Sequence, residues 1–195
     1  MNVAICLDRD GVLIKDVHLL ASPGDIQILE GVPQALRNLK EAGFKLIVVS
    51  NQTVVARGLI TEREVYVVNA EMERLLEQVG GPHLDGFYFC PHHPNATLSE
   101  YRVDCDCRKP RPGLLLRAAR ELDLNLGDSF MIGDRITDII AGARAGCRTM
   151  LVQTGKHEEP PIEMVEPLDD SVQPDHTCAN LSEAARWILG VRGKE

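Results

Sequence analysis

The sequence predicts an α/β protein in which a doubly wound parallel sheet carries helices on both faces. Short apolar runs typical of strands alternate with longer amphipathic segments typical of helices, from residue 3 to residue 189. The run 44–49 is apolar at nearly every position, as expected for a strand that is covered on both faces. Because parallel neighbours need long crossover connections, this alternation favours a Rossmann-like parallel sheet.

Each element is expected at a definite place along the chain. The predicted strands are 3–8, 44–50, 86–90, 129–133 and 147–153, and the predicted helices are 32–42, 61–79, 112–123, 136–145 and 181–189. Pro33 suits the first turn of a helix, and Gly43 and Gly146 each follow a predicted helix end. Residues 61–64 (Thr-Glu-Arg-Glu) form a capping-box pattern at the start of the second helix.

The composition fits one globular domain spanning residues 1–195, with 44% apolar residues. The net charge of −8 argues against general nucleic-acid binding. No apolar run approaches the ~20 residues that cross a membrane, and the chain begins directly with a strand, so we expect a cytoplasmic protein. We also expect a monomer. The proline-rich, acidic segment 156–177 predicts a flexible surface loop.

Asp8 and Asp10 stand at the end of the first predicted strand. Side chains alternate along an extended backbone, so both carboxylates can face one spot, and Gly11 allows a sharp turn away from the strand. Two carboxylates at one point repel each other unless a cation or a shared proton lies between them. The pair therefore indicates a metal-assisted reaction in which one carboxylate attacks and the other transfers protons.

Polar residues that end the other strands should lie at the same edge of the sheet. Residues 50–53 (Ser-Asn-Gln-Thr) can donate hydrogen bonds to a phosphoryl group, although an ordinary polar turn would give the same string. Asp134 ends the fourth strand, and Asp138 follows one helical turn later, as a ligand, an orienting group or a helix-capping acid. Oxygen ligands from Asp8, Asp134 and the backbone carbonyl or side chain of Asp10 suit Mg²⁺.

A cationic turn precedes the predicted helix 112–123. It contains Arg108, Lys109 and Arg111, and two prolines stiffen it. In an acidic protein, a rigid cationic turn fits an anionic ligand better than it fits a solvated face.

Four segments resemble, in order and spacing, the motifs of the haloacid dehalogenase superfamily. They are Asp8-Arg9-Asp10-Gly11-Val12, Ser50-Asn51-Gln52, Arg108-Lys109-Pro110, and Gly133-Asp134 with Asp138. Within that superfamily, the segments 56–58 (Ala-Arg-Gly), 90–94 (Cys-Pro-His-His-Pro) and 105–110 (Cys-Asp-Cys-Arg-Lys-Pro) resemble the heptose bisphosphate phosphatases. The chain departs from that pattern at 53–55 (Thr-Val-Val) and at 16–19 (Asp-Val-His-Leu), positions that touch the far end of the substrate in the family.

The resemblance implies a Mg²⁺-dependent phosphatase without a large cap domain, acting on a small phosphorylated sugar such as a heptose bisphosphate. Asp8 would be the nucleophile that forms an aspartyl-phosphate, and Asp10 would protonate the leaving oxygen and then activate water. Ser50 and Lys109 would hold the phosphoryl oxygens, and Asp134 would complete the Mg²⁺ site. The implied substrate contacts are Asn51, Gln52, Thr53, Arg57, Arg108 and Arg135.

The loop 90–107 carries a set of metal-ligand residues. Cys90 and His92 are separated from Cys105 and Cys107 by twelve residues, which gives three thiols and one imidazole. Such a set satisfies a tetrahedral structural Zn²⁺ without an open position, and scattered buried thiols are the alternative. His93 is a rival ligand; the resemblance favours His92.

Two other functions stay open from the sequence. Histidinol-phosphate phosphatase belongs to the same superfamily and carries a similar zinc loop. A phospho-accepting signalling domain also places an aspartate at a strand end beside acidic residues, a hydroxyl and a lysine, although it lacks a second aspartate two residues after the acceptor. Turnover of the phosphoprotein distinguishes an enzyme from such a domain.

Overall fold

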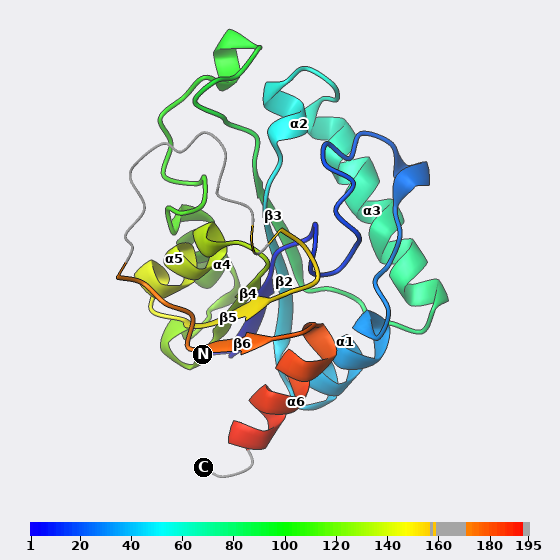
Figure 1. Cartoon of the computed structure of the whole chain (residues 1–195), viewed down its shortest axis with the longest axis vertical. Helices are drawn as coiled ribbons and strands as arrows, with labels where there is room; N and C mark the ends of the chain where they lie inside the picture. Colours follow the sequence, from blue (N-terminus) through cyan, green and yellow to red (C-terminus); the bar gives the residue numbers. More distant parts are fainter. Residues whose placement is uncertain (157, 159–170, 193–195) are drawn as a thin grey trace.

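A six-stranded, entirely parallel sheet forms the centre of the computed structural model, which describes residues 1–156, 158 and 171–192 (Figure 1). The strands are β1 (Ala4–Leu7), β2 (Lys45–Asn51), β3 (Gly86–Cys90), β4 (Phe130–Gly133), β5 (Arg148–Val152) and β6 (His176–Cys178). Their order in the sheet is β3-β2-β1-β4-β5-β6. The order reverses between β1 and β4, and open α/β sheets bind ligands beyond the carboxyl ends of the strands at such a switch point.

Helices cover both faces of the sheet, as the sequence predicts (Figure 1). They are α1 (Val32–Glu41), α2 (Thr53–Ala56), α3 (Glu62–Gln78), α4 (Gly113–Leu122), α5 (Ile136–Ala145) and α6 (Leu181–Arg192). Ile5 and Leu7 of β1 belong to a core cluster with side chains of α1, α3 and α6. Ala4 and Cys6 alternate with them and belong to a second cluster with α4 and α5. This two-sided burial fixes the register of the strands that carry the site.

The five predicted strands and the five longer helices lie where the sequence predicts them, with boundaries that differ by at most three residues. The structure adds α2 and β6, which the sequence analysis missed. The prediction of a loop over 156–177 is wrong at its end, because His176 and Thr177 belong to β6 and pair with β5. Residues 157 and 159–170 of that segment lie outside the described residues.

The connections after β1 and β3 contain little regular secondary structure. Residues 8–31 and 91–112 are all described, and each segment contains one 3-10 turn, at Pro23–Asp25 and Ser99–Tyr101. The prediction that no large cap domain is inserted is therefore confirmed for these segments. Among the described residues, no helix combines the length and apolarity that spanning a membrane requires.

Candidate active site and metal-ligand clusters

A cleft of about 610 Å³ lies beyond the carboxyl ends of the strands. Ten residues that the sequence analysis selected line it: Asp8, Asp10, Ser50, Asn51, Gln52, Thr53, Arg57, Arg108, Lys109 and Arg135. They come from five separate segments of the chain. The parallel sheet brings these segments together because each follows a strand or precedes a helix at the same edge.

Three carboxylates gather at the switch point of the sheet. Asp8 follows β1, Asp134 follows β4 and Asp138 lies in the first turn of α5. One oxygen from each lies within 4.8 Å of the other two. The Oδ2 atom of Asp138 also accepts a hydrogen bond from the backbone N–H of Arg135 at 3.0 Å, so this residue caps α5 as well as joining the cluster.

The carboxylate of Asp134 lies in an environment that disfavours its negative charge. Its Oδ2 atom accepts a hydrogen bond from the N–H of Lys156 at 2.7 Å, but its buried Oδ1 atom has no hydrogen-bond partner within the described part of the chain. Burial, together with the charges of Asp8 and Asp138, raises the pKa of Asp134 to about 7. An orphaned carboxylate oxygen beside two further carboxylates is a fit for a hard divalent cation such as Mg²⁺.

Two glycines let the backbone approach Asp134. Gly11 has a positive φ of 82°, and a Cβ there would lie 2.5 Å from Oδ2 of Asp134. A Cβ on Gly155 would clash with the same oxygen. The turn after β1 and the segment after β5 therefore close on this carboxylate from two sides.

Lys109 supplies the positive charge of the cluster. Its Nζ atom lies 3.1 Å from Oδ1 of Asp8 and 2.6 Å from Oδ1 of Asp138, and it donates a hydrogen bond to the carbonyl oxygen of Val49 at 2.7 Å. Burial lowers the pKa of Lys109, but the two carboxylates outweigh this effect and raise the pKa to about 12. The ammonium is therefore charged and held beside Asp8.

The side-chain amide of Asn51 holds the peptide of Lys109. It donates to the carbonyl oxygen and accepts from the N–H of that residue, both at 3.1 Å. The amide of Gln52 is buried and donates to Oγ of Ser50 at 2.8 Å and to Oδ2 of Asp10 at 3.3 Å. Both residues line the cleft, but their side-chain amides orient other site residues.

The carboxylate of Asp10 lies outside the group formed by Asp8, Asp134 and Asp138. It pairs instead with Arg9, whose Nη2 atom lies 2.9 Å from Oδ2 of Asp10. Burial raises the pKa of Asp10, Arg9 lowers it and Asp8 raises it, and the net shift is upward. A partly buried carboxyl with a raised pKa that faces a cleft suits proton transfer.

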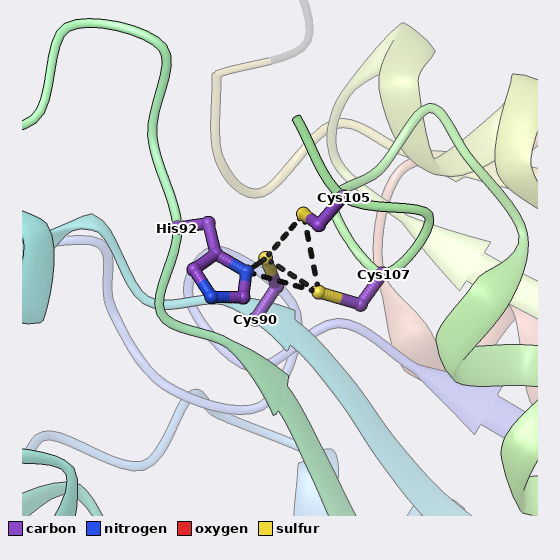
Figure 2. Close-up of side chains that lie close together, drawn as sticks. All are labelled: Cys90, His92, Cys105 and Cys107. Carbon is purple, nitrogen blue, oxygen red and sulfur yellow. Dashed lines mark hydrogen bonds between the residues drawn. The ribbon is translucent and has the colours of Figure 1, made fainter. Parts of the chain in front are cut away.

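The three predicted cysteines and His92 form a second cluster, beyond the carboxyl end of β3 (Figure 2). The Sγ atom of Cys107 lies 3.0 Å from that of Cys90 and 3.2 Å from that of Cys105, and the Cys90–Cys105 distance is 3.6 Å. The Nδ1 atom of His92 lies 3.4 Å from Sγ of Cys107. A disulfide needs about 2.05 Å between sulfurs. A tetrahedron with Zn–S bonds of about 2.3 Å has edges near 3.8 Å, so the set is consistent with a zinc loop.

His93 is not part of this cluster among the described residues. Its Nδ1 atom accepts a hydrogen bond from the N–H of Asn95 at 3.1 Å, and the residue lines the cleft. Arg108 joins the two regions, because its Nη1 atom donates to the carbonyl oxygen of His92 at 2.9 Å and to Oγ1 of Thr53 at 3.5 Å. The Cys/His cluster therefore adjoins the wall of the cleft.

Arg9, Asn69 and Lys156 belong to the site but were not predicted from the sequence. Arg9 and Asn69 form a buried contact at 3.1 Å between Nη1 and Oδ1. Lys156 lines the cleft, and its Nζ atom lies 3.3 Å from Oδ2 of Asp16. The position of Arg9 between two motif aspartates was a usable signal, whereas no local pattern marks Asn69 or Lys156.

The fold and the strand-end carboxylates define the class of this protein as a HAD-like hydrolase, and residues 106–184 match the family model described as HAD-hydrolase-like. The chain is 38% identical over 193 residues to the D-glycero-beta-D-manno-heptose-1,7-bisphosphate 7-phosphatase of Pasteurella multocida, covering 98% of this chain and 100% of the relative. The chain therefore belongs to the family of these heptose bisphosphate phosphatases.

Two further comparisons agree with this assignment. The chain is 44% identical over 154 residues to the enzyme of the same name from Yersinia pestis, covering 78% of this chain and 81% of the relative. Among solved structures, it is similar to the D,D-heptose 1,7-bisphosphate phosphatase of B. bronchiseptica, complexed with magnesium and phosphate, at 33% identity and a TM-score of 0.80. That match covers 98% of this chain and 99% of the other.

Proposed function

We propose that this protein is a Mg²⁺-dependent phosphatase that removes the C7 phosphate of D-glycero-beta-D-manno-heptose 1,7-bisphosphate. The observation that carries the proposal is the group of Asp8, Asp134, Asp138 and Lys109 at the switch point, beside a cleft lined by further cations. The names of the related enzymes supply the substrate and the position of the phosphate. The expectations of a cytoplasmic location and a monomer stay predictions.

In the proposed reaction, a carboxylate oxygen of Asp8 attacks phosphorus and the bond from phosphorus to the sugar oxygen breaks. Asp10 gives its proton to that oxygen, and an aspartyl-phosphate remains. A water molecule then attacks phosphorus, Asp10 takes its proton, and the bond between Asp8 and phosphorus breaks to release inorganic phosphate. Lys109 and Ser50 hold the phosphoryl oxygens, and Lys109 also keeps Asp8 oriented.

Asp8, Asp134 and the backbone carbonyl of Asp10 would hold the Mg²⁺, and the Oδ1 atom of Asp134, which has no hydrogen-bond partner among the described residues, supports this assignment. Bound there, the cation would neutralise charge that builds up on the phosphoryl oxygens. We assign substrate contacts to Thr53, Arg57, Arg108 and Arg135, which line the cleft. Asn51 and Gln52 act on substrate through the residues that they orient.

We further propose a structural Zn²⁺ on Cys90, His92, Cys105 and Cys107. The support is geometric, because the three sulfurs lie 3.0 to 3.6 Å apart with Nδ1 of His92 beside them, as four ligands of one zinc ion would. All four positions of a tetrahedron are filled by protein, which leaves no place for a reactive water. The role is therefore to fix the start of the segment that carries Arg108 and Lys109.

A substrate screen tests the enzyme proposal. The purified protein with Mg²⁺ is given heptose 1,7-bisphosphate as both anomers, histidinol phosphate and fructose 1,6-bisphosphate, and phosphorus NMR follows each phosphate. We expect the C7 phosphate of the heptose to disappear first while the anomeric phosphate stays. Preference for histidinol phosphate would contradict the proposed substrate. A stable phosphoprotein without turnover would contradict the proposal that the protein is an enzyme.

A further inference from the structure

Arg9 is a fully buried arginine in the turn that carries both candidate catalytic carboxylates. Its side chain is 2% exposed. A buried ion pair adds little to stability, because removing both charges from water offsets their attraction. Stability alone therefore does not explain why Arg9 is buried here with hydrogen-bond partners.

The partners of Arg9 come from three segments that are distant in sequence. Its Nε atom donates to Oδ2 of Asp10 at 3.1 Å, and its Nη2 atom donates to Oε1 of Gln52 at 2.9 Å. Its Nη1 atom donates to Oδ1 of Asn69 at 3.1 Å. The planar guanidinium thus joins the turn after β1 to the end of β2 and to the buried face of α3.

The two oxygens of the Asp10 carboxylate accept different hydrogen bonds. Among the described residues, Oδ2 accepts hydrogen bonds from Nε of Arg9 at 3.1 Å and from the amide of Gln52 at 3.3 Å, and Nη2 of Arg9 lies 2.9 Å from it as an ion-pair contact. Oδ1 accepts one hydrogen bond, from Nη2 at 3.3 Å. Two donors therefore occupy the lone pairs of Oδ2, whereas Oδ1 keeps a lone pair that can carry a proton to a leaving group.

We infer that Arg9, anchored by Asn69, is a positioning residue that fixes the rotamer of Asp10 so that one defined oxygen transfers the proton. This inference rests on the proposed function of Asp10 as acid and base. Asn69 matters because it holds the far end of the guanidinium. Without that contact, the fork of Arg9 can rotate away from the plane of the carboxylate.

Asn69→Ala tests this inference, with Val68→Ala as its matched control. Val68 lies next to Asn69 on α3, is also buried, belongs to the apolar core and has no side-chain group that can accept a hydrogen bond from Arg9. Both variants shorten a buried side chain on the same helix, and only Asn69→Ala removes a partner of Arg9. The measurement is kcat/KM for p-nitrophenyl phosphate, phenyl phosphate and heptose 1,7-bisphosphate, with Tm recorded for each variant.

A misplaced general acid slows the hydrolysis of esters with poor leaving groups most, because these need protonation as they depart. Esters such as p-nitrophenyl phosphate are slowed less, because p-nitrophenolate departs with little protonation. For Asn69→Ala we expect kcat/KM to fall about tenfold for phenyl phosphate and the heptose substrate, and less than about threefold for p-nitrophenyl phosphate. Val68→Ala should lower Tm without changing the ratio between phenyl and p-nitrophenyl phosphate. A purely structural role for Asn69 predicts that both variants leave that ratio unchanged, and this result would overturn the inference.

Arg9→Lys provides an independent second variant if Asn69→Ala does not fold. Lysine keeps the charge but cannot bind two oxygens with a planar fork. The same change in leaving-group ratio is expected, and an unchanged ratio contradicts the inference. If the wild type hydrolyses the aryl phosphates but not the heptose, the proposed substrate fails, while the aryl pair still decides the role of Arg9.

Discussion

The two edges of the sheet differ in their ratio of carboxylates to lysines. At the carboxyl edge, Asp8, Asp134 and Asp138 form one group, and the ammonium of Lys109 pairs with Asp8 and Asp138. At the amino edge, Asp85 precedes β3 and is paired with two lysines of neighbouring elements, Lys40 and Lys45. In the first arrangement three carboxylates face one lysine, and in the second one carboxylate faces two lysines.

The pKa shifts at the two edges run in opposite directions for this reason. At the carboxyl edge, burial and neighbouring carboxylates raise the pKa of Asp134 to about 7. At the amino edge, burial raises the pKa of Asp85, but the hydrogen bonds from Lys40, from the N–H of Leu46 and from Lys45 outweigh it and the net shift is downward. The paired charges of the amino edge favour stability. The carboxyl edge is where we propose a cation and a phosphoryl group, and perturbed groups in a cleft are typical of function.

Asp8→Asn, at the carboxyl edge, should produce the largest effect on phosphatase activity. An amide cannot form the aspartyl-phosphate, so phosphate release should fall by about 10⁴-fold or more. The fold should persist because asparagine has nearly the same shape. Circular dichroism checks the fold, and a Tm series checks that the stabilisation by 10 mM Mg²⁺ shrinks in the variant.

Asp123→Asn is the matched control for that variant. Asp123 is an exposed residue at the end of α4, and its left-handed backbone conformation suits asparagine. Activity and the response to Mg²⁺ should stay at the wild-type level. Retained activity in Asp8→Asn would remove the assignment of the nucleophile.

Cys107→Ser should give the next largest effect, through the second cluster of the carboxyl edge. Serine is a poor zinc ligand, so elemental analysis of protein made without added zinc should find about one Zn²⁺ per wild-type chain and almost none in the variant. Because Arg108 and Lys109 follow directly, small displacements should lower kcat/KM by roughly 10- to 100-fold. Cys178→Ser, a buried thiol outside the cluster, should keep its zinc. Wild-type protein that contains neither zinc nor iron would contradict the proposal.

Much of the carboxyl edge could be predicted from the sequence because each part has a local signal. Apolar runs that end in Asp8 and Asp134 mark strand ends, and the parallel topology brings those ends together. The cysteine spacing likewise marks its own cluster. What escaped prediction depends on tertiary contacts: β6 has three residues and no apolar run, and Asn69 looks like any polar residue on a helix until Arg9 is placed beside it.

The roles of two predicted residues also depended on geometry that the sequence does not contain. Asn51 and Gln52 stand in a motif whose polar groups suit a phosphate, but their amides bind the Lys109 peptide and the Ser50 hydroxyl. A list of polar residues at a strand end cannot distinguish a group that contacts ligand from one that orients its neighbour. Asp85 shows the same limit at the amino edge, because its lysine partners come from α1 and β2.

Asp85→Asn should give the smallest effect and tests the amino edge alone. Since the pKa of Asp85 is lowered in the folded state, its carboxylate stabilises the fold fully above its unfolded pKa of about 3.9, and this contribution is lost as the pH falls through the lower folded pKa. Urea unfolding at pH 7 should therefore show a loss of roughly 1 kcal/mol in the variant. The difference between variant and wild type should shrink below about pH 4, where the wild-type carboxylate also becomes protonated. kcat should stay unchanged at pH 7, because the two edges lie at opposite ends of the strands. A variant that unfolds with the same urea midpoint as the wild type at pH 7 would show that the two lysines contribute no net stability, and the contrast between the edges would then rest on the acidic cluster alone.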